Sequence, residues 1–184
     1  MKIACVLIVT ANRVAKVRDI VLPSVLKAAF DEVLWVGDGF EGDGYRFLAV
    51  PKITGTTVDA LVKRDVGTLA TDASHIFYLC DDHALTHFDR DAAEADIYIP
   101  QRWCWRDGQR QTLNSGAESG YCGGHAGLFS RDIIMRQPWS TMPHHPNWDL
   151  LASSVQASMY PPPLVRTGNT IVVEDLEPER EPWR

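Results

Sequence analysis

Short apolar runs alternate with stretches of helical spacing through the first 90 residues. Apolar residues recur every three or four positions after Val14 and again from Thr57 to Thr71, which predicts two amphipathic helices, the first bent or interrupted at Pro23. The alternation of strands and helices predicts an α/β fold with right-handed crossovers between parallel strands. The runs with the β-branched and aromatic content of strands are Ile3 to Thr10, Glu32 to Val36, Tyr45 to Val50 and Ile76 to Leu79.

Polar side chains directly follow three of these strands. Asn12 and Arg13 follow the first strand, Asp38 follows the second between two glycines, and the triplet Asp81-Asp82-His83 follows Cys80 at the end of the fourth. Because the carboxyl ends of parallel strands meet at the edge where α/β proteins bind ligands, we expect these side chains to lie together. Asp38 would accept hydrogen bonds from a ribose or a base, or would simply be a turn residue.

Two adjacent carboxylates such as Asp81 and Asp82 repel each other unless a cation or a proton intervenes. A divalent metal that carries phosphates is the natural cation, because Mg²⁺ and Mn²⁺ prefer oxygen ligands. The alternative is a solvated turn in which an Asp caps the next helix. The pattern alone leaves both interpretations open.

Composition limits the class of protein. With 184 residues, 45% of them hydrophobic and 23% charged, the chain fits one globular domain. A formal charge of -6 gives no sequence-wide basic field, so it does not imply broad electrostatic attachment to nucleic acid or anionic lipid, although it permits a local basic groove. The N-terminal apolar run is too short to span a bilayer, so we expect a cytoplasmic protein without membrane insertion. The four cysteines form no CxxC pair, and Cys5 and Cys80 are expected to be reduced thiols in strands.

The second half has a weaker pattern. Ala95 to Pro100 predicts another strand, and a long polar, Gly-rich stretch follows it. A loop of that length is usually functional or mobile. Trp103 and Trp105 at its start are expected either to stack on a sugar or base or to belong to the core.

Six segments, taken in order, resemble those of GT-A glycosyltransferases of the family 2 type. RDVG, at Arg64 to Gly67, is similar to the family's RNxG, with Asp65 in place of Asn, although an ordinary exposed ion pair would also explain Arg64 and Asp65. The CDD of Cys80 to Asp82 falls on the DxD metal motif, with Cys80 in place of the first Asp. The segments are VTANR, VGDG, KRDVGTLAT, HIFYLCDDHAL, HAGLFSRDIIMRQPW and PHHPNWDLLASSVQAS.

This resemblance implies a fold class and a domain plan. The expected architecture is a single GT-A (Rossmann-like) domain, with a mostly parallel central sheet and helices on both faces. It would span residues 1–174, with a nucleotide-sugar-binding half at 1–90 and an acceptor-side half at 91–174. Residues 175–184 would form a polar tail.

The resemblance also implies roles for individual residues. Asp82 and His83 would hold Mn²⁺ or Mg²⁺, and Asp149, at the start of a predicted helix, would be the catalytic base. His144 and His145 are its rivals for that role, or candidates for a metal ligand position, and His125 is a further candidate base, since Asn147 stands where the family has its acid. The residues expected to bind the donor are Thr10, Asn12, Arg13, Asp38, Arg64 and Asp81.

The implied activity is the metal-dependent transfer of a hexose-type sugar from a nucleotide sugar, with a UDP-sugar as the expected donor. The acceptor hydroxyl would belong to a soluble saccharide, a protein, a small molecule, or a hydroxylated base of nucleic acid such as phage DNA. The alternatives are a sugar nucleotidyltransferase and a non-catalytic nucleotide- or sugar-binding domain of the same fold. The anomeric outcome and the oligomeric state are left open.

Overall fold

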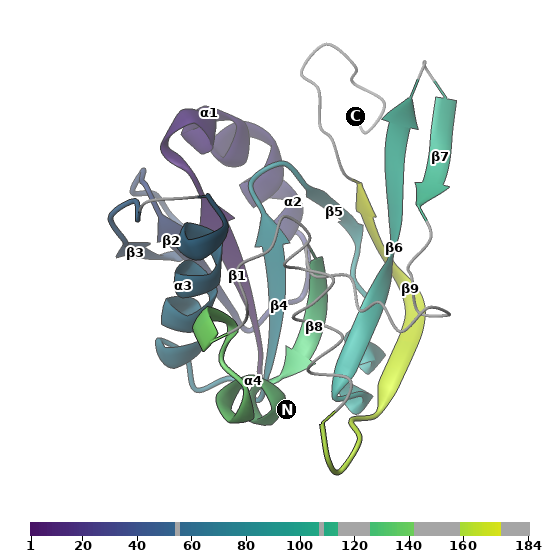
Figure 1. The fold of residues 1–184 in the computed structure, drawn as a ribbon. Coiled ribbons are helices and arrows are strands. Elements are labelled where there is room, and N and C mark those ends of the chain that lie inside the picture. Colours follow the sequence, from purple (N-terminus) through teal and green to yellow (C-terminus); the bar gives the residue numbers. More distant parts are fainter. Residues whose placement is uncertain (54–55, 107–108, 114–125, 142–158, 174–184) are drawn as a thin grey trace.

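The computed structural model describes residues 1–53, 56–106, 109–113, 126–141 and 159–173 (Figure 1). Within these parts, nine strands form one mixed sheet with helices on both of its faces. The strands are β1 (Ile3–Val9), β2 (Glu32–Gly37), β3 (Arg46–Ala49), β4 (His75–Cys80), β5 (Ala84–His87), β6 (Ile97–Arg106), β7 (Gln109–Leu113), β8 (Ala126–Ser130) and β9 (Val165–Val173).

The first half of the sheet is the parallel unit that the sequence predicts. Its strands stand in the order β3-β2-β1-β4, and every neighbouring pair is parallel. Leu7 in the central strand pairs with Trp35 on one side and with Leu79 on the other. All residues of β1 are buried, as expected for a strand that is covered on both faces.

The second half corrects the expectation of a mostly parallel sheet. There β8 runs antiparallel to β4 and β6, β7 runs antiparallel to β6, and β5 runs antiparallel to β9, while only β6 and β9 are parallel. Parallel neighbours need a crossover of a dozen or more residues, whereas only two residues separate the paired strands β6 and β7 in the chain. The hairpin β6-β7 also occupies the start of the stretch that the sequence pattern assigned to a loop.

The turn after β4 leads into a strand and not into a helix. A backbone hydrogen bond from the His83 amide to the Cys80 carbonyl, 3.2 Å long, closes this turn, and β5 follows at Ala84. Neither Asp81 nor Asp82 therefore caps a helix. The sequence pattern predicted neither β5 nor β9.

The first helical segment is continuous but irregular. It passes from a 3-10 turn (Ala11–Arg13) through α1 (Val14–Lys16) and a π-helical turn (Val17–Val21) into α2 (Leu22–Leu26). Pro23 is the second residue of α2, one residue after the π-helical turn, so the helical hydrogen-bond pattern changes beside the proline, which cannot donate to the carbonyl four residues earlier, but the helix is not broken there. The residues that anchor this segment on one face of the sheet are Val17, Val21 and Val25, all fully buried.

The opposite face carries α3 (Thr56–Leu69) and the short α4 (Arg131–Arg136) (Figure 1). A Cβ atom added at Gly67 of α3 would lie 2.5 Å from a methyl group of Val6 in β1. Only glycine therefore lets the helix approach the strand this closely. The glycine of the RDVG segment is explained by this packing. The described 3-10 turns of the second half are Arg90–Glu94 and Trp139–Thr141.

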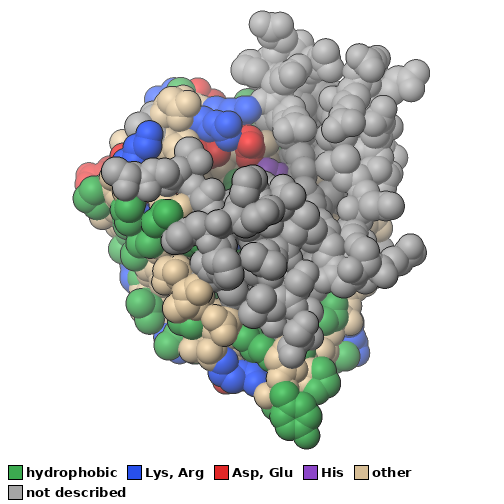
Figure 2. Space-filling view, in the orientation of Figure 1, with side chains coloured by type: hydrophobic (Ala, Val, Ile, Leu, Met, Phe, Trp, Pro, Cys, Tyr) green, Lys and Arg blue, Asp and Glu red, His purple; other side chains and the backbone are tan. Residues whose placement is uncertain are grey.

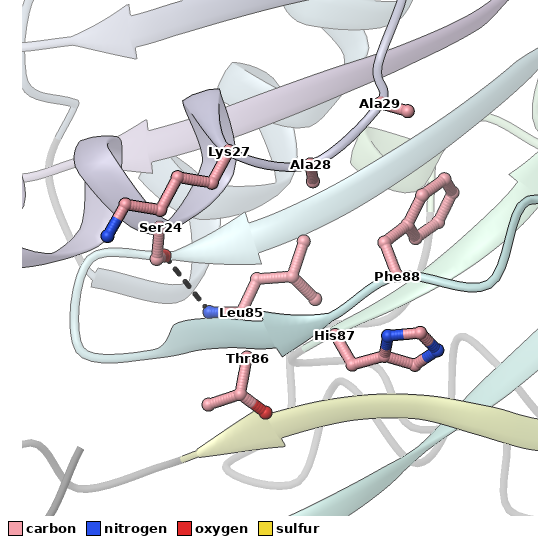
Figure 3. Close-up of a pocket in the computed structure, with 8 residues that line it drawn as sticks. All are labelled: Ser24, Lys27, Ala28, Ala29, Leu85, Thr86, His87 and Phe88. Carbon is pink, nitrogen blue, oxygen red and sulfur yellow. Dashed lines mark hydrogen bonds between the residues drawn. The ribbon is translucent and has the colours of Figure 1, made fainter. Parts of the chain in front are cut away.

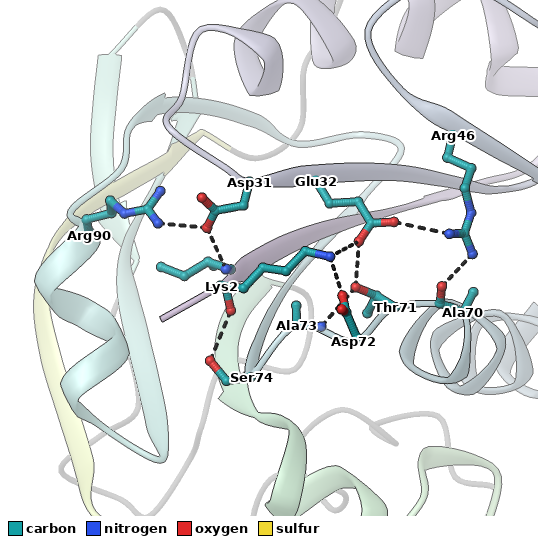
Figure 4. A network of polar contacts seen from close by, with 11 residues as sticks. Lys2, Asp31, Glu32, Arg46, Ala70, Thr71, Asp72, Ala73, Ser74 and Arg90 are labelled. Atoms are coloured by element: carbon teal, nitrogen blue, oxygen red, sulfur yellow. Dashed lines mark hydrogen bonds and ion pairs between the residues drawn. The ribbon is translucent and has the colours of Figure 1, made fainter.

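A network of charges ties the chain together where β1 and β2 begin (Figure 4). Glu32 accepts a hydrogen bond from the Thr71 hydroxyl at 2.7 Å and pairs with Lys2 at 3.2 Å and Arg46 at 3.3 Å. Arg90 pairs with Asp31 at 2.7 Å. Most of these groups are partly exposed, so the network contributes little free energy and mainly fixes how the loops lie.

None of the described helices combines the length and the apolar character that a membrane span requires. Cys5 and Cys80 are not in disulfides, as expected, and burial raises the pKa of the Cys5 thiol.

Replacing Gly67 with alanine tests the contact between α3 and β1. Alanine is the better helix former by about 1 kcal/mol, but the clash with Val6 costs about 1 to 3 kcal/mol. We expect Gly67→Ala to lower the free energy of unfolding by about 1 kcal/mol in urea denaturation.

The control is Leu69→Ala in the same helix, because Leu69 is 65% exposed. It should change stability by less than about 0.5 kcal/mol. A Gly67→Ala protein as stable as the wild type would show that α3 does not need this close approach.

Candidate functional site

The Asp81 carboxylate joins the carboxyl ends of β1 and β4. Its Oδ2 accepts hydrogen bonds from the Thr10 backbone amide at 2.9 Å and from the Thr10 hydroxyl at 2.5 Å. Asp81 is only 6% exposed. A charged acceptor with two donors from the neighbouring strand fixes the edge of the sheet at which the predicted site residues lie.

Arg13 bridges the two adjacent acids. Its Nη1 lies 2.7 Å from Asp81 Oδ1 and 2.8 Å from Asp82 Oδ2. Burial lowers the pKa of the Arg13 guanidinium, but the charges and hydrogen bonds of the two acids outweigh it and raise that pKa. Figure 2 shows basic, acidic and histidine side chains side by side near the end of the molecule at which β1 and β4 finish in Figure 1.

His83 completes this cluster. Its Nδ1 lies 2.5 Å from Asp82 Oδ1, and the residue is 4% exposed. Burial would raise the pKa of Asp82, but the hydrogen bond and charge of His83, together with Arg13, hold that pKa well below its ordinary value. Asp82 is therefore a carboxylate at neutral pH, with one oxygen on Arg13 and the other on His83.

A second group of charges lies under the end of β2. The ammonium of Lys63, on α3, lies 2.6 Å from Asp59 Oδ2, 3.0 Å from the Val9 carbonyl oxygen and 3.9 Å from Asp38 Oδ2. The Lys63 side chain is fully buried, whereas that of Asp38 is 29% exposed. Asp38 thus stands at the surface with a cation beneath it.

These contacts test whether the described residues fit the divalent cation that the resemblance implies. Asp81 is engaged by Thr10 and Arg13, and both oxygens of Asp82 are engaged by Arg13 and His83. In the described parts of the chain, no three His, Cys, Asp or Glu side chains come together as a metal would require. This arrangement does not fit a divalent cation, and the metal roles of Asp82 and His83 stay predictions.

Arg64 packs against two aromatic rings and the last residue of β4. It is fully buried, with its guanidinium 4.6 Å from the ring centre of Trp139, 5.1 Å from that of Tyr78, and 3.9 Å from the Cys80 sulfur. Its neighbour Asp65 accepts hydrogen bonds from the backbone amides of Trp139 at 2.9 Å and Ser140 at 2.8 Å. Because Arg64 is buried, it does not belong to an exposed ion pair, and its donor-binding role stays a prediction.

The structure brings together five of the predicted site residues, namely Thr10, Arg13, Asp81, Asp82 and His83. The Thr10 hydroxyl also lies 3.1 Å from the side-chain oxygen of Asn12, which is exposed. The predicted base residues lie outside the described parts of the chain, as do the tail and the family's base position. The predicted base residues are Asp149, His145, His144 and His125, the family's base position is Asn147, and the tail is residues 175–184.

Sequence reasoning missed the pair formed by Lys63 and Asp59. The available signal was their spacing, because an acid and a lysine four residues apart face the same side of a helix. Such a pair is ordinarily an exposed one, so its burial could be seen only in the fold.

A pocket of about 300 Å³ lies away from this cluster, between the end of α2 and β5 (Figure 3). The Ser24 hydroxyl beside it is already satisfied, since it donates to the Val21 carbonyl at 2.6 Å and accepts from the Leu85 amide at 3.1 Å. The pocket supplies no buried charge, and we do not assign it a ligand. Its lining residues are Ser24, Lys27, Ala28, Ala29, Leu85, Thr86, His87 and Phe88.

Comparison with known proteins supports the fold. No protein-family model and no curated protein sequence matches the chain. Among solved structures, S. aureus TarS, a family 2-like glycosyltransferase, superposes over 98% of this chain and 38% of its own, with a TM-score of 0.65 and 12% identity. The chain has a GT-A-like glycosyltransferase fold.

Two further structures of TarS residues 1–349 carry ligands. The complex with UDP-GlcNAc matches over 96% of this chain and 57% of that one, with a TM-score of 0.61 and 14% identity. The complex with UDP matches over 96% of this chain and 59% of that one, with a TM-score of 0.58 and 13% identity. The GT-A-like chain thus spans between 38% and 59% of the length of these neighbours.

The role of Asp81 at the sheet edge leads to a stability prediction. Asp81→Asn removes the charge that Thr10 and Arg13 share, and it places an NH₂ donor where one carboxylate oxygen accepted hydrogen bonds. We expect the free energy of unfolding to fall by about 1 to 3 kcal/mol, measured by urea denaturation at pH 7.

The matched control is Asp19→Asn, since Asp19 also pairs with an arginine, Arg18, at 2.6 Å, but on the surface. That variant should unfold at nearly the wild-type urea concentration. Equal losses in the two variants would show that Asp81 does no more than a surface acid.

Proposed function

We propose that this chain binds a nucleotide-sugar donor at the carboxyl edge of β1, β2 and β4 and transfers the sugar to an acceptor hydroxyl. The observation that carries the proposal is the gathering of Thr10, Arg13, Asp81 and Asp82 beside Asp38 at this edge of a GT-A-like fold. The complexes of TarS with UDP-GlcNAc and UDP support a uridine diphosphate sugar as the donor class.

The described side chains divide the work of binding between them. Asp38 is an acceptor at the surface and suits an N–H or O–H donor of the nucleoside. Arg13 has a side chain that is 41% exposed, so its guanidinium can turn from the acids toward a diphosphate and neutralise charge that develops on the leaving group. Asp81 holds the end of β1 in place while this happens.

Chemistry also requires a base that takes the proton of the acceptor hydroxyl. We assign this role to Asp149, with His145 as the rival, from the resemblance of their segment alone. A requirement for Mn²⁺ or Mg²⁺ rests on the same resemblance. The described acids of the cluster, Asp81 and Asp82, are engaged by Arg13 and His83.

Calorimetry with UDP and with UDP-GlcNAc, each in EDTA and in Mn²⁺, tests the proposal. We expect the wild type to bind UDP, and Arg13→Gln to weaken binding by about 10-fold to 100-fold in EDTA, the weight of a charge-assisted contact. The matched control is Arg18→Gln, which removes a partly exposed arginine from the same helical segment and should leave the affinity unchanged.

Three results would count against the proposal or part of it. A wild type that binds neither ligand under either condition contradicts nucleotide-sugar binding. Equal affinities of the Arg13→Gln and wild-type proteins remove Arg13 from the diphosphate site. Turnover of a nucleoside triphosphate with a sugar 1-phosphate, without release of UDP from UDP-GlcNAc, would favour a sugar nucleotidyltransferase.

The assignment of the base predicts a separation of binding from turnover. Asp149→Asn should leave UDP affinity and melting temperature near the wild-type values while turnover of the donor falls by about two to four powers of ten. The measurement is release of UDP from UDP-GlcNAc in the presence of a panel of hydroxyl acceptors.

His145→Asn is the companion variant in the same segment. Near-normal turnover in Asp149→Asn together with a large loss in His145→Asn would move the role of base to the histidine.

A further inference from the structure

Lys63 is a buried lysine next to Asp38, one of the residues of the proposed donor site. Its side chain is fully buried, and its ammonium lies 2.6 Å from Asp59 Oδ2 and 3.0 Å from the Val9 carbonyl oxygen. Burying an ammonium is unfavourable unless it is paired and hydrogen-bonded. Asp59 provides that pairing and is itself held by the Ile53 amide at 2.9 Å.

The backbone at Gly37 packs closely against Val9 and Lys63. Gly37 has a φ of +135°, and a Cβ atom there would lie 2.1 Å from the Val9 carbonyl oxygen and 3.2 Å from Lys63 Cε. The same Val9 oxygen accepts a hydrogen bond from the Asp38 amide at 3.4 Å. Lys63 therefore supports the Gly37-Asp38 turn directly from below.

The orientation of Asp38 fits this support. Its Oδ2 is buried, has no hydrogen-bond partner within the described parts of the chain, and lies 3.9 Å from the Lys63 ammonium. Since the side chain is nevertheless 29% exposed, its exposure belongs to its other atoms. On the other side of the turn, the Trp35 indole donates to the Asp38 carbonyl oxygen at 2.8 Å. One carboxylate oxygen thus faces the lysine, and the backbone is fixed from both sides.

We propose that Lys63 is a positioning residue for nucleotide binding, acting through Asp38. Its ammonium attracts Asp38 Oδ2 inward and so presents the rest of the carboxylate to an N–H or O–H donor of the nucleoside. The inference rests on the proposed function, because it needs a nucleotide at Asp38. Lys63 itself touches no substrate.

A double-mutant cycle between Lys63 and Asp38 tests this, with UDP affinity from calorimetry and melting temperature as the readouts. Asp38→Asn should weaken UDP binding by about tenfold or more, and Lys63→Met by a similar factor. If Lys63 acts through Asp38, the double variant should bind UDP no more weakly than Asp38→Asn, within about twofold. Lys27→Met removes an exposed lysine and is the matched control, with wild-type affinity expected.

Lys63→Met leaves Asp59 as a lone buried charge, so the cycle is repeated with Lys63→Met/Asp59→Asn, which removes the pair as a unit. If the losses of UDP affinity from Lys63→Met and Asp38→Asn multiply when the two substitutions are combined, the proposal is overturned, because Lys63 then acts independently of Asp38. Wild-type affinity in Lys63→Met/Asp59→Asn would also overturn it. A wild-type protein that does not bind UDP would overturn the proposed function, and this inference with it.

Discussion

The attachment of Asp81 to Thr10 is the constraint on which this edge of the molecule depends. Parallel strands carry no hairpin to join their ends, so the carboxyl ends of β1 and β4 need another connection. One carboxylate oxygen supplies it by taking both the amide and the hydroxyl of Thr10. The chain then turns into Arg13 from a fixed point, and the guanidinium meets the second oxygen of Asp81. The geometry of the cluster follows from this one acceptor.

The balance of charge at the edge determines what a diphosphate would meet there. Four acids, Asp38, Asp59, Asp81 and Asp82, stand against the two basic side chains Arg13 and Lys63 and against His83, whose charge helps to hold the pKa of Asp82 low. An incoming diphosphate therefore meets more acidic than basic side chains. Its binding requires a basic side chain that can leave its carboxylate partner and pair with the diphosphate. Lys63 is buried and committed to Asp59, whereas Arg13 is partly exposed and shared between two acids. Re-pairing Arg13 is the smaller rearrangement, because its side chain is already 41% exposed.

The sequence predicted the first half of the fold well for a physical reason. Strands buried on both faces read as continuous apolar runs, so β1, β2 and β4 stand within about two residues of their expected bounds. The second half gives no such signal. In β9, the sequence Val165-Arg-Thr-Gly-Asn-Thr reads as a turn, and β5 has four residues, of which only the first two are buried. The burial of Lys63 was also hidden, because a helical acid–lysine pair looks the same in sequence whether water or another element covers it.

The RDVG segment shows how a resemblance in sequence and a role in structure can differ. Successive helical residues point about 100° apart, so its members meet different neighbours. Arg64 lies against Trp139 beneath Cys80, Asp65 receives the amides of Trp139 and Ser140, and Gly67 lets α3 settle on Val6. These contacts join α3 to β1, to the end of β4 and to the segment after α4. The RDVG residues thus hold α3 against the sheet and against the segment after α4. Lys63, the residue just before them, is the one that contacts the turn containing Asp38.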